Sequence, residues 1–194
     1  MGGRGLRGPA GLVAILFVLA IRAEASTLHF EANRGQAPAR VRFLARAPGY
    51  TLWLTPEEAV LSLGQGPASS SLSMRLAGAR HGVEPKGVQE LSGKVNLYRG
   101  KDPSGWLQGI PTYARIEQRG VYRGVDLVYQ AGDQWIEYDL VVRPGGNPRV
   151  IALEFRGADR LSLTETGDIV LAVNGGVVRH RHPRVYQDVD GARR

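Results

Sequence analysis

Alternation of apolar and polar residues is strongest between Val125 and Arg143, where two apolar runs flank the short glycine-containing connection 130–134. In the second run every second residue is apolar, at Ile136, Tyr138, Leu140 and Val142. A period of two is that of a strand with one buried face, because a helix repeats every 3.6 residues. The pattern predicts an antiparallel hairpin. Its apolar face needs further strands to pack on, since an isolated hairpin is only marginally stable.

Shorter alternating segments follow one another along the rest of the chain, separated by turn residues roughly every 8–12 positions. We predict strands in the segments 41–46, 50–55, 59–63, 72–79, 150–155, 161–163, 169–173 and 177–179, with one helical turn at 55–58. No connection has room for a crossover helix. The spacing therefore indicates an all-β fold, an antiparallel β-sandwich of about ten or more short strands.

Two of these segments share one pattern. Residues 72–79 and 151–158 both alternate apolar residues, carry a charge at the fourth position and end in Gly-Ala, and a hairpin-like pair precedes each. We interpret the repeat as a sign of two similar β halves packed on each other. The longer stretch 93–113 is less regular, and we expect it to cross between sheets and to be anchored by Tyr98 and Trp106.

The amino terminus has the composition of a secretory signal peptide. Residues 1–8 carry Arg4 and Arg7 without an acid, the apolar run 10–21 follows, and Ala23-Glu24-Ala25 is a small-x-small cleavage site. As a helix the run would rise only ~18 Å, too little for a hydrocarbon core of ~30 Å. We predict a cleaved signal peptide helix at 1–25, a single β-sandwich domain at 26–194, secretion or a cell-surface location, and no membrane span after cleavage.

Composition narrows the classes of function further. The absence of cysteine excludes disulfide scaffolds, zinc–thiolate sites and thiol catalysis. The formal net charge is +7, but the Lys and Arg residues are scattered and form no run longer than a pair. This distribution is typical of solvated strand faces rather than of a nucleic-acid-binding surface, so we predict no nucleic-acid partner.

The closest grouping of carboxylates lies on the mixed face of the central hairpin, at Asp126, Glu137 and Asp139, with Trp135 on the same face. Such a group could perform glycosidase-type acid/base chemistry or hold calcium, and with the tryptophan it could bind a sugar. Alternatively, the carboxylates lie on an exposed strand face and form ordinary cross-strand ion pairs, which we favour. Their partners would then be the arginines of the neighbouring strands, Arg115, Arg119, Arg123 and Arg143.

Other residues with possible chemistry are weaker candidates. His180 and His182 have a spacing that could grip a transition metal, but the sequence indicates no third ligand nearby, so we predict no metal site. No serine has a Gly-x-Ser-x-Gly context, and no Gly-x-Gly-x-x-Gly run indicates a nucleotide cofactor. The three tryptophans could form a sugar-stacking platform, although core positions are the more usual place for them.

A set of distinctive segments spans nearly the whole of 26–194, namely 30–36 (FEANRGQ), 41–46, 49–55, 93–96, 111–113, 121–129, 137–139 and 183–187. In this order they resemble a known family, the amino-terminal domain of bacterial proteins with seven-bladed β-propeller (SBBP) repeats. The resemblance implies an exported, β-rich domain of unknown function with no assigned catalytic residues and no cofactor.

The resemblance also implies an architecture. Chains of that family continue from this domain into the repeats, whereas this sequence stops at Arg194. We expect either a fragment truncated at its C-terminus or a standalone module. The resemblance favours a non-catalytic module whose partners are downstream propeller repeats or another cell-surface protein. Glycan binding or hydrolysis on the Asp126, Glu137 and Asp139 face is the alternative.

Overall fold

The computed structural model describes residues 12–20, 28–64, 69–132, 135–174, 176–189 and 192–193, with 12–20, 188–189 and 192–193 described by their backbone alone. Within these residues there is no α-helix, and the two helical segments, η2 (Pro103–Gly105) and η3 (Pro148–Val150), are single 3₁₀ turns. No helix in the described part is long and apolar enough to cross a membrane. The predicted all-β class is confirmed.

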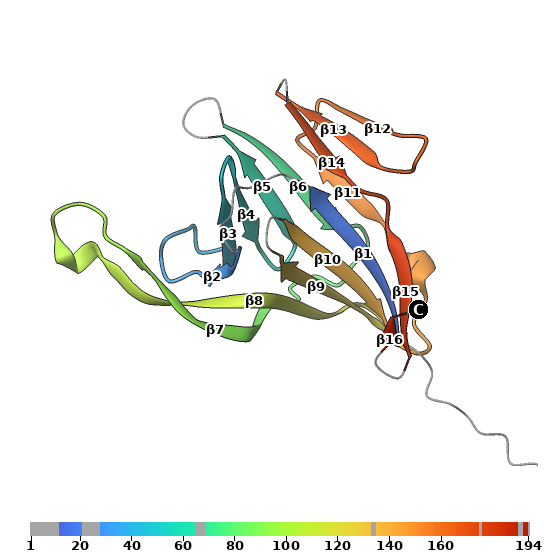
Figure 1. The fold of residues 1–194 in the computed structure, drawn as a ribbon, viewed down its shortest axis with the longest axis horizontal. Coiled ribbons are helices and arrows are strands. Elements are labelled where there is room, and N and C mark those ends of the chain that lie inside the picture. The colour runs from blue at the N-terminus through green and yellow to red at the C-terminus, as the bar shows by residue number, and fades with distance from the viewer. Residues whose placement is uncertain are drawn as a thin grey trace, which may run out of the picture.

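Antiparallel strands make one continuous, strongly curved sheet (Figure 1). The strands are β1 (Leu12–Ala20), β2 (Phe30–Ala32), β3 (Phe43–Ala47), β4 (Tyr50–Leu54), β5 (Glu58–Leu63), β6 (Ser70–Leu76), β7 (Lys86–Leu97), β8 (Leu107–Tyr122), β9 (Val125–Ala131), β10 (Ile136–Val142), β11 (Leu153–Arg156), β12 (Arg160–Leu163), β13 (Ile169–Val173), β14 (Gly176–His180), β15 (Arg184–Val189) and β16 (Ala192–Arg193). Their order is β11-β6-β5-β4-β3-β2-β8-β9-β10-β1-β14-β13-β12, with β7 beside β8, β15 beside β1 and β16 beside β15.

The core lies between two parts of this sheet that face each other. Apolar side chains of β4, β5 and β6 meet those of β9, β10 and β14 in one cluster, which gives the fold its sandwich-like build. The bulkiest fully buried side chains include Phe30, Leu54, Ile116, Leu140 and Leu171. Burial of these side chains is the main source of stability, since the chain has no disulfide.

The central hairpin forms as predicted. β9 and β10 pair over seven residues each, from Ile136 opposite Ala131 to Val142 opposite Val125. The four apolar residues of β10 that alternate in the sequence are all buried, between 0% and 5% exposed. Alternation was informative here because the strand has a dry face on one side and a polar face on the other.

The stretch expected to cross between sheets forms a projecting arm instead. β7 pairs with β8 from Lys86 opposite Glu117 to Leu97 opposite Leu107, and this two-stranded ribbon extends away from the body (Figure 1). Tyr98 lies at the tip of the arm and is 59% exposed, so it is no core anchor. The prediction failed because β7 has few large apolar residues to mark it as a strand.

The two segments with the shared pattern lie side by side. β11 pairs with β6, with Glu154 opposite Arg75 and Phe155 opposite Met74. The Arg75 guanidinium donates to Glu154 (Nε to Oε2, 2.7 Å), so the charges at the fourth positions form an ion pair. Similarity of two halves stays a prediction, but the pairing explains why the two patterns match, because adjacent strands share one buried face.

The helical turn predicted at 55–58 is a tight turn without helix. The Thr55 hydroxyl accepts hydrogen bonds from the N–H groups of Glu57 (3.2 Å) and Glu58 (3.0 Å), and the Thr55 N–H donates to the Glu58 carbonyl (3.0 Å). Threonine thus caps the turn as predicted, but Glu58 enters β5 opposite Arg75 and ends any helix.

The apolar run assigned to a signal peptide helix is a strand where the structure describes it. Residues 12–20 form β1, which pairs with β10 on one side and with β14 and β15 on the other. A continuous apolar run fits a leader helix and a strand between two neighbours equally well by pattern, so the sequence favoured the wrong conformation. The proposed cleavage site at 23–25 lies outside the described residues.

Candidate functional site

Asp126, on β9, links β8 to the residue that follows β10 at one end of the central hairpin. Its Oδ1 accepts a hydrogen bond from the Gly120 N–H (2.6 Å), and its Oδ2 accepts from Arg143 (2.8 Å to Nε). The Asp126 residue is only 8% exposed. Its carboxylate therefore serves as a fixed acceptor that holds the β8–β9 turn against the end of β10.

Asp139 is buried near the middle of β10 and contacts two other strands. Its Oδ2 accepts from Gln130 Nε2 of β9 (2.7 Å) and from the Tyr186 hydroxyl of β15 (3.2 Å). Three strands are thus joined at one carboxylate oxygen.

Glu137 and Trp135 form a third, separate contact. The Trp135 indole N–H donates to Glu137 Oε1 at 2.8 Å, and both side chains are half-buried. This pair lies at the loop end of the hairpin, where Glu137 is opposite Gln130. The contact satisfies the indole N–H, so the apolar ring of Trp135 is fixed beside the carboxylate.

The three carboxylates share one face, as the alternation predicts, but they do not act on a common point. The expectation that this face is exposed is wrong, since Asp126 and Asp139 are buried beneath their partners. Each is held by different partners, and of the four arginines proposed as matches Arg143 binds Asp126, while Arg115 and Arg119 bind Glu117 instead. Among the described residues, no three His, Asp or Glu side chains are grouped so as to hold a metal ion. The arrangement supplies structural contacts rather than paired acid and base groups.

The two histidines considered as metal ligands face different surroundings. His180 is 1% exposed, and its Nε2 lies 2.6 Å from the Tyr138 hydroxyl. Burial lowers the pKa of His180 to about 4 and raises that of Tyr138, so the contact joins two neutral groups. His182 lies beyond the end of β14 and is exposed.

Asp168 bonds both the backbone and the ring of His182. Its Oδ1 accepts from the His182 N–H (2.9 Å) and lies 3.0 Å from His182 Nδ1, while Arg179 donates to Oδ2 (3.3 Å). These hydrogen bonds lower the pKa of Asp168 to about 2. His182 is thus held in a turn contact by Asp168, whereas His180 bonds to Tyr138 in the core.

The three tryptophans do not form a platform. Trp53 lies on β4 opposite Leu44 and Val60, Trp135 lies at the end of the central hairpin, and Trp106 lies at the tip of the arm. They also do not occupy the core positions that the sequence favoured, since all three are half-buried.

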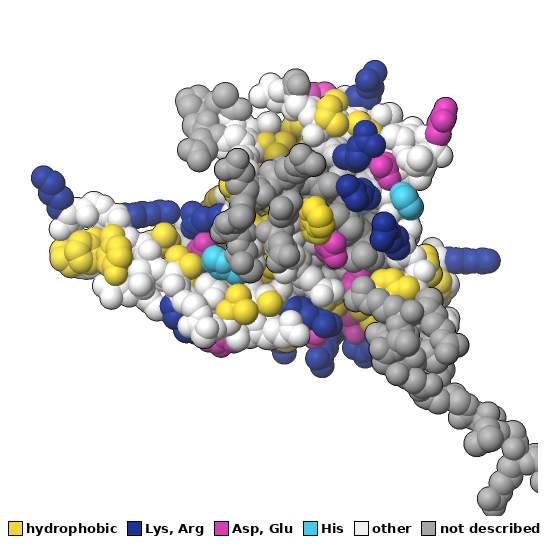
Figure 2. Space-filling model, viewed as in Figure 1, with side chains coloured by type: hydrophobic (Ala, Val, Ile, Leu, Met, Phe, Trp, Pro, Cys, Tyr) yellow, Lys and Arg dark blue, Asp and Glu magenta, His cyan; other side chains and the backbone are white. Residues whose placement is uncertain are grey.

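The arm tip, residues 96–109, is the most distinctive exposed feature of the molecule. The rings of Tyr98 and Trp106 pack edge to face with centroids 5.0 Å apart, and Figure 2 shows hydrophobic side chains gathered at the end of the arm with Lys and Arg side chains near them. The basic residues of the tip are Arg99 and Lys101, both exposed.

Several hydrogen bonds keep the tip in one shape. The Asp102 carboxylate accepts from the Ser104 N–H (2.9 Å), and Asn96 Oδ1 accepts from the Gly109 N–H (2.8 Å). Gly100 and Gly109 have φ near +70°, a region that favours glycine. The exposed Tyr98 ring and the half-buried Trp106 ring are therefore presented by a turn that these hydrogen bonds hold.

Comparison with protein families places the chain. A family model described as a domain of unknown function (DUF7948) matches residues 30–194. The chain belongs to this family. No curated protein and no solved structure matches it.

The matched part of the DUF7948 domain opens with a turn that sequence reasoning did not recognise as structural. Asn33 Nδ2 donates to the carbonyls of Ala37 (3.1 Å), Pro38 (3.0 Å) and Val41 (2.8 Å), and its Oδ1 accepts from the Gly35 N–H (3.0 Å). One side chain thus organises the whole loop between β2 and β3. Asparagine and glycine in the segment 30–36 were the available signal.

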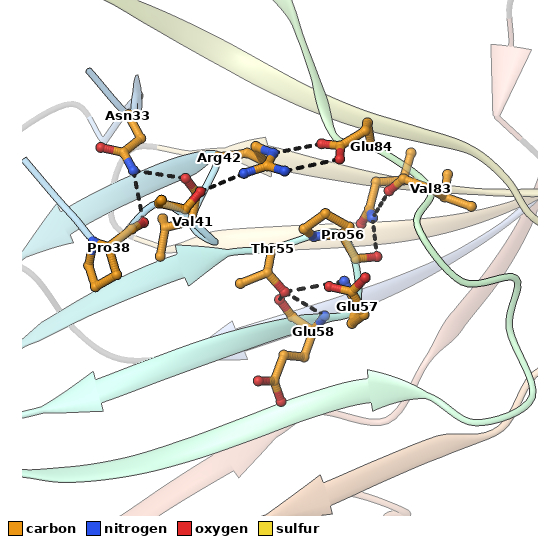
Figure 3. A network of polar contacts seen from close by, with 12 residues as sticks. Asn33, Pro38, Val41, Arg42, Thr55, Pro56, Glu57, Glu58, Val83 and Glu84 are labelled. Carbon is orange, nitrogen blue, oxygen red and sulfur yellow. Dashed lines mark hydrogen bonds and ion pairs between the residues drawn. The ribbon is translucent and has the colours of Figure 1, made fainter. Parts of the chain in front are cut away.

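A second missed residue is Gln118, which is 4% exposed on β8. Its Nε2 donates to the carbonyls of Val83 (2.7 Å) and Pro56 (3.0 Å), two segments far apart in the sequence. Nearby, the Arg42 guanidinium donates twice to Glu84 (2.7 and 3.1 Å), as Figure 3 shows. In the DUF7948 domain these contacts attach the base of the arm to the body. No pattern in the sequence predicts them.

Proposed function

We propose that this DUF7948 domain is a non-catalytic interaction module, exported as the amino-terminal part of a secreted or cell-surface protein with SBBP propeller repeats. Its partners are the downstream repeats or another cell-surface protein. The resemblance to such proteins and the leader-like residues 1–25 support the export and the context. The separate bonding of Asp126, Glu137 and Asp139 supports binding over catalysis.

The observation that carries this proposal is the arm. A two-stranded ribbon that leaves the body gains little from the core, yet its tip is ordered and displays Tyr98 and Trp106. Aromatic residues presented in a fixed shape lose little entropy on binding and are enriched at the centres of protein interfaces. The arm tip is therefore the contact surface that we assign to the partner.

Binding to a separately produced SBBP propeller array tests the proposal. Calorimetry should show binding by the chain and at least a tenfold loss of affinity for the double variant Tyr98→Ala, Trp106→Ala. The matched control is Val177→Ala, an exposed apolar residue on β14, which should bind as the unaltered chain does. Equal affinity for all three proteins would contradict the role of the arm, and absence of binding by the unaltered chain would contradict the partner.

Carbohydrate binding is the second candidate, and the Trp135–Glu137 pair favours it. The indole could stack on a sugar ring while Glu137 accepts from a hydroxyl group. A glycan array probed with the chain and with Trp135→Ala separates the two candidates. Binding that is lost with Trp135→Ala and kept with Tyr98→Ala would support the sugar site, whereas an array without signal would exclude it.

A further inference from the structure

One position in the sheet is occupied by a segment whose sequence marks it for removal. Along one edge β1 pairs with β10 from Val13 opposite Val142 to Leu19 opposite Ile136. Along its other edge it pairs with β15 over 12–16 and with β14 at Leu19 and Ala20. We call the position between β10 and these two strands the β1 slot.

The β1 slot is bordered by residues of the core. Its β10 side carries the buried residues Tyr138 and Leu140, and its β14 side carries Val178 and His180. The 2.6 Å contact between Tyr138 and His180 links the two borders of the slot. One strand, β1, fills the position between these borders, since it pairs with β10 on one edge and with β14 on the other.

The segment in the slot has the chemistry of a strand and of a leader at once. Its nine residues, LVAILFVLA, contain no charge, no proline and no glycine. The same residues make up most of the apolar run of the expected signal peptide. If the leader is cut off, β10 becomes an open edge with a row of unpaired N–H and C=O groups beside an apolar face.

We propose that the β1 slot is a strand-acceptor site, filled after leader removal by an uncharged extended segment of about nine residues from the partner polypeptide. The incoming strand runs antiparallel to β10, because β10 and β15 both run antiparallel to β1. Main-chain hydrogen bonds to two edges hold it, and alternate apolar side chains face the core. This inference rests on the removal of the leader, which belongs to the proposed function.

An exchange experiment on the full chain tests the slot. A specific protease site is placed within residues 21–27, the folded protein is cut there, and the products are separated by gel filtration. The amino-terminal fragment should stay with the body. A fluorescent peptide with the sequence of residues 12–20, made soluble by terminal lysines, should then replace it, and the same peptide with Ile15→Pro should not, because proline removes a main-chain donor.

Two results would overturn the slot. One is release of the fragment on cutting while the body stays monomeric with an unchanged melting temperature. The other is equal exchange by the Ile15→Pro peptide. Export is tested separately by mass spectrometry of the amino terminus of the secreted chain, which should begin at Ser26. A chain that keeps residues 1–25 in the cell would overturn leader removal even if the peptide exchanges in vitro.

Discussion

Two antiparallel hairpins of this protein show how differently the same local structure can be used. The central hairpin β9–β10 is bordered by β8 and β1, and nearly all of its side chains are buried or half-buried. Among the described residues, β7 of the arm hairpin pairs with β8 alone, and most of β7 is exposed. The comparison teaches that burial comes from the neighbours that a hairpin meets, and less from the pairing of its two strands.

The central hairpin and the arm hairpin also differ in how regularly their strands pair. β9 and β10 pair without interruption, whereas β7 and β8 shift register between Glu90 and Lys94 and again between Val95 and Leu97. Gln89, just before the first shift, has a φ of 56°, which is strained for a residue other than glycine. Bulges of this kind twist and bend a ribbon, in keeping with the way the arm leaves the body.

The largest expected effect is the loss of stability when an apolar side chain is removed from the central hairpin rather than from the arm. Leu140→Ala on β10 should lower the free energy of unfolding by roughly 2–5 kcal/mol, because Leu140 is fully buried and its removal leaves a cavity. Leu97→Ala on β7, the same exchange at a half-exposed site, should cost about 1 kcal/mol or less. Urea denaturation measures both, and equal losses would contradict the division between body and arm.

Acid should destabilise the body of the protein through His180, which is buried in its core. Burial lowers the pKa of His180 to about 4, so between pH 6.5 and 4 the unfolded chain binds a proton that the folded chain does not. The contribution of neutral, buried His180 to the free energy of unfolding is therefore fully present above pH 6.5. It is lost as the pH drops, and the loss is about 2 kcal/mol between pH 7 and pH 5. Denaturation curves at the two pH values measure this fall. The variant His180→Gln should flatten it, and an unchanged slope in that variant would assign the effect to other groups.

Gln118 lies where the arm joins the body, and its side-chain hydrogen bonds should contribute to stability there. Gln118→Leu leaves the carbonyls of Pro56 and Val83 without their donor and should cost roughly 1–3 kcal/mol. The matched control is Gln108→Leu, an exposed glutamine on the same strand within the arm, with an expected change within about 0.5 kcal/mol. Thermal melting of both variants checks the difference, which should vanish if Gln118 is only a surface residue.

The smallest expected effect on stability is at the arm tip. Tyr98→Ala removes an edge-to-face contact with Trp106 in an exposed turn and should change the free energy of unfolding by about 1 kcal/mol or less. Chemical denaturation monitored by circular dichroism provides the measurement. A loss comparable to that of Leu140→Ala would show that the tip packs on the body.

Sequence reasoning succeeded where a strand has one dry face. The alternation in 125–143 gave the strand β10, its buried side chains and the shared face of Asp126, Glu137 and Asp139. It also named Arg143 as a match, which the ion pair with Asp126 bears out. Period-two patterns are informative because every second side chain meets the core.

It failed where the outcome depends on distant neighbours. The pairing of β6 with β11 joins residues 79 positions apart at Arg75 and Glu154, and no local signal chooses that partner. β7 lacks alternation because the body does not cover it, and the continuous apolar run of β1 carries no period that could distinguish helix from strand. The bonds of Gln118 were beyond prediction for the same reason.

The dispersal of the tryptophans has an optical consequence. Trp53 lies on β4, Trp106 in the arm tip and Trp135 at the end of the central hairpin, so native emission sums three unlike surroundings. Variants that keep one indole each resolve that sum into three local signals. The fluorescence of Trp106 alone then reports on the conformation of the arm, while that of Trp53 and of Trp135 reports on the unfolding of the body.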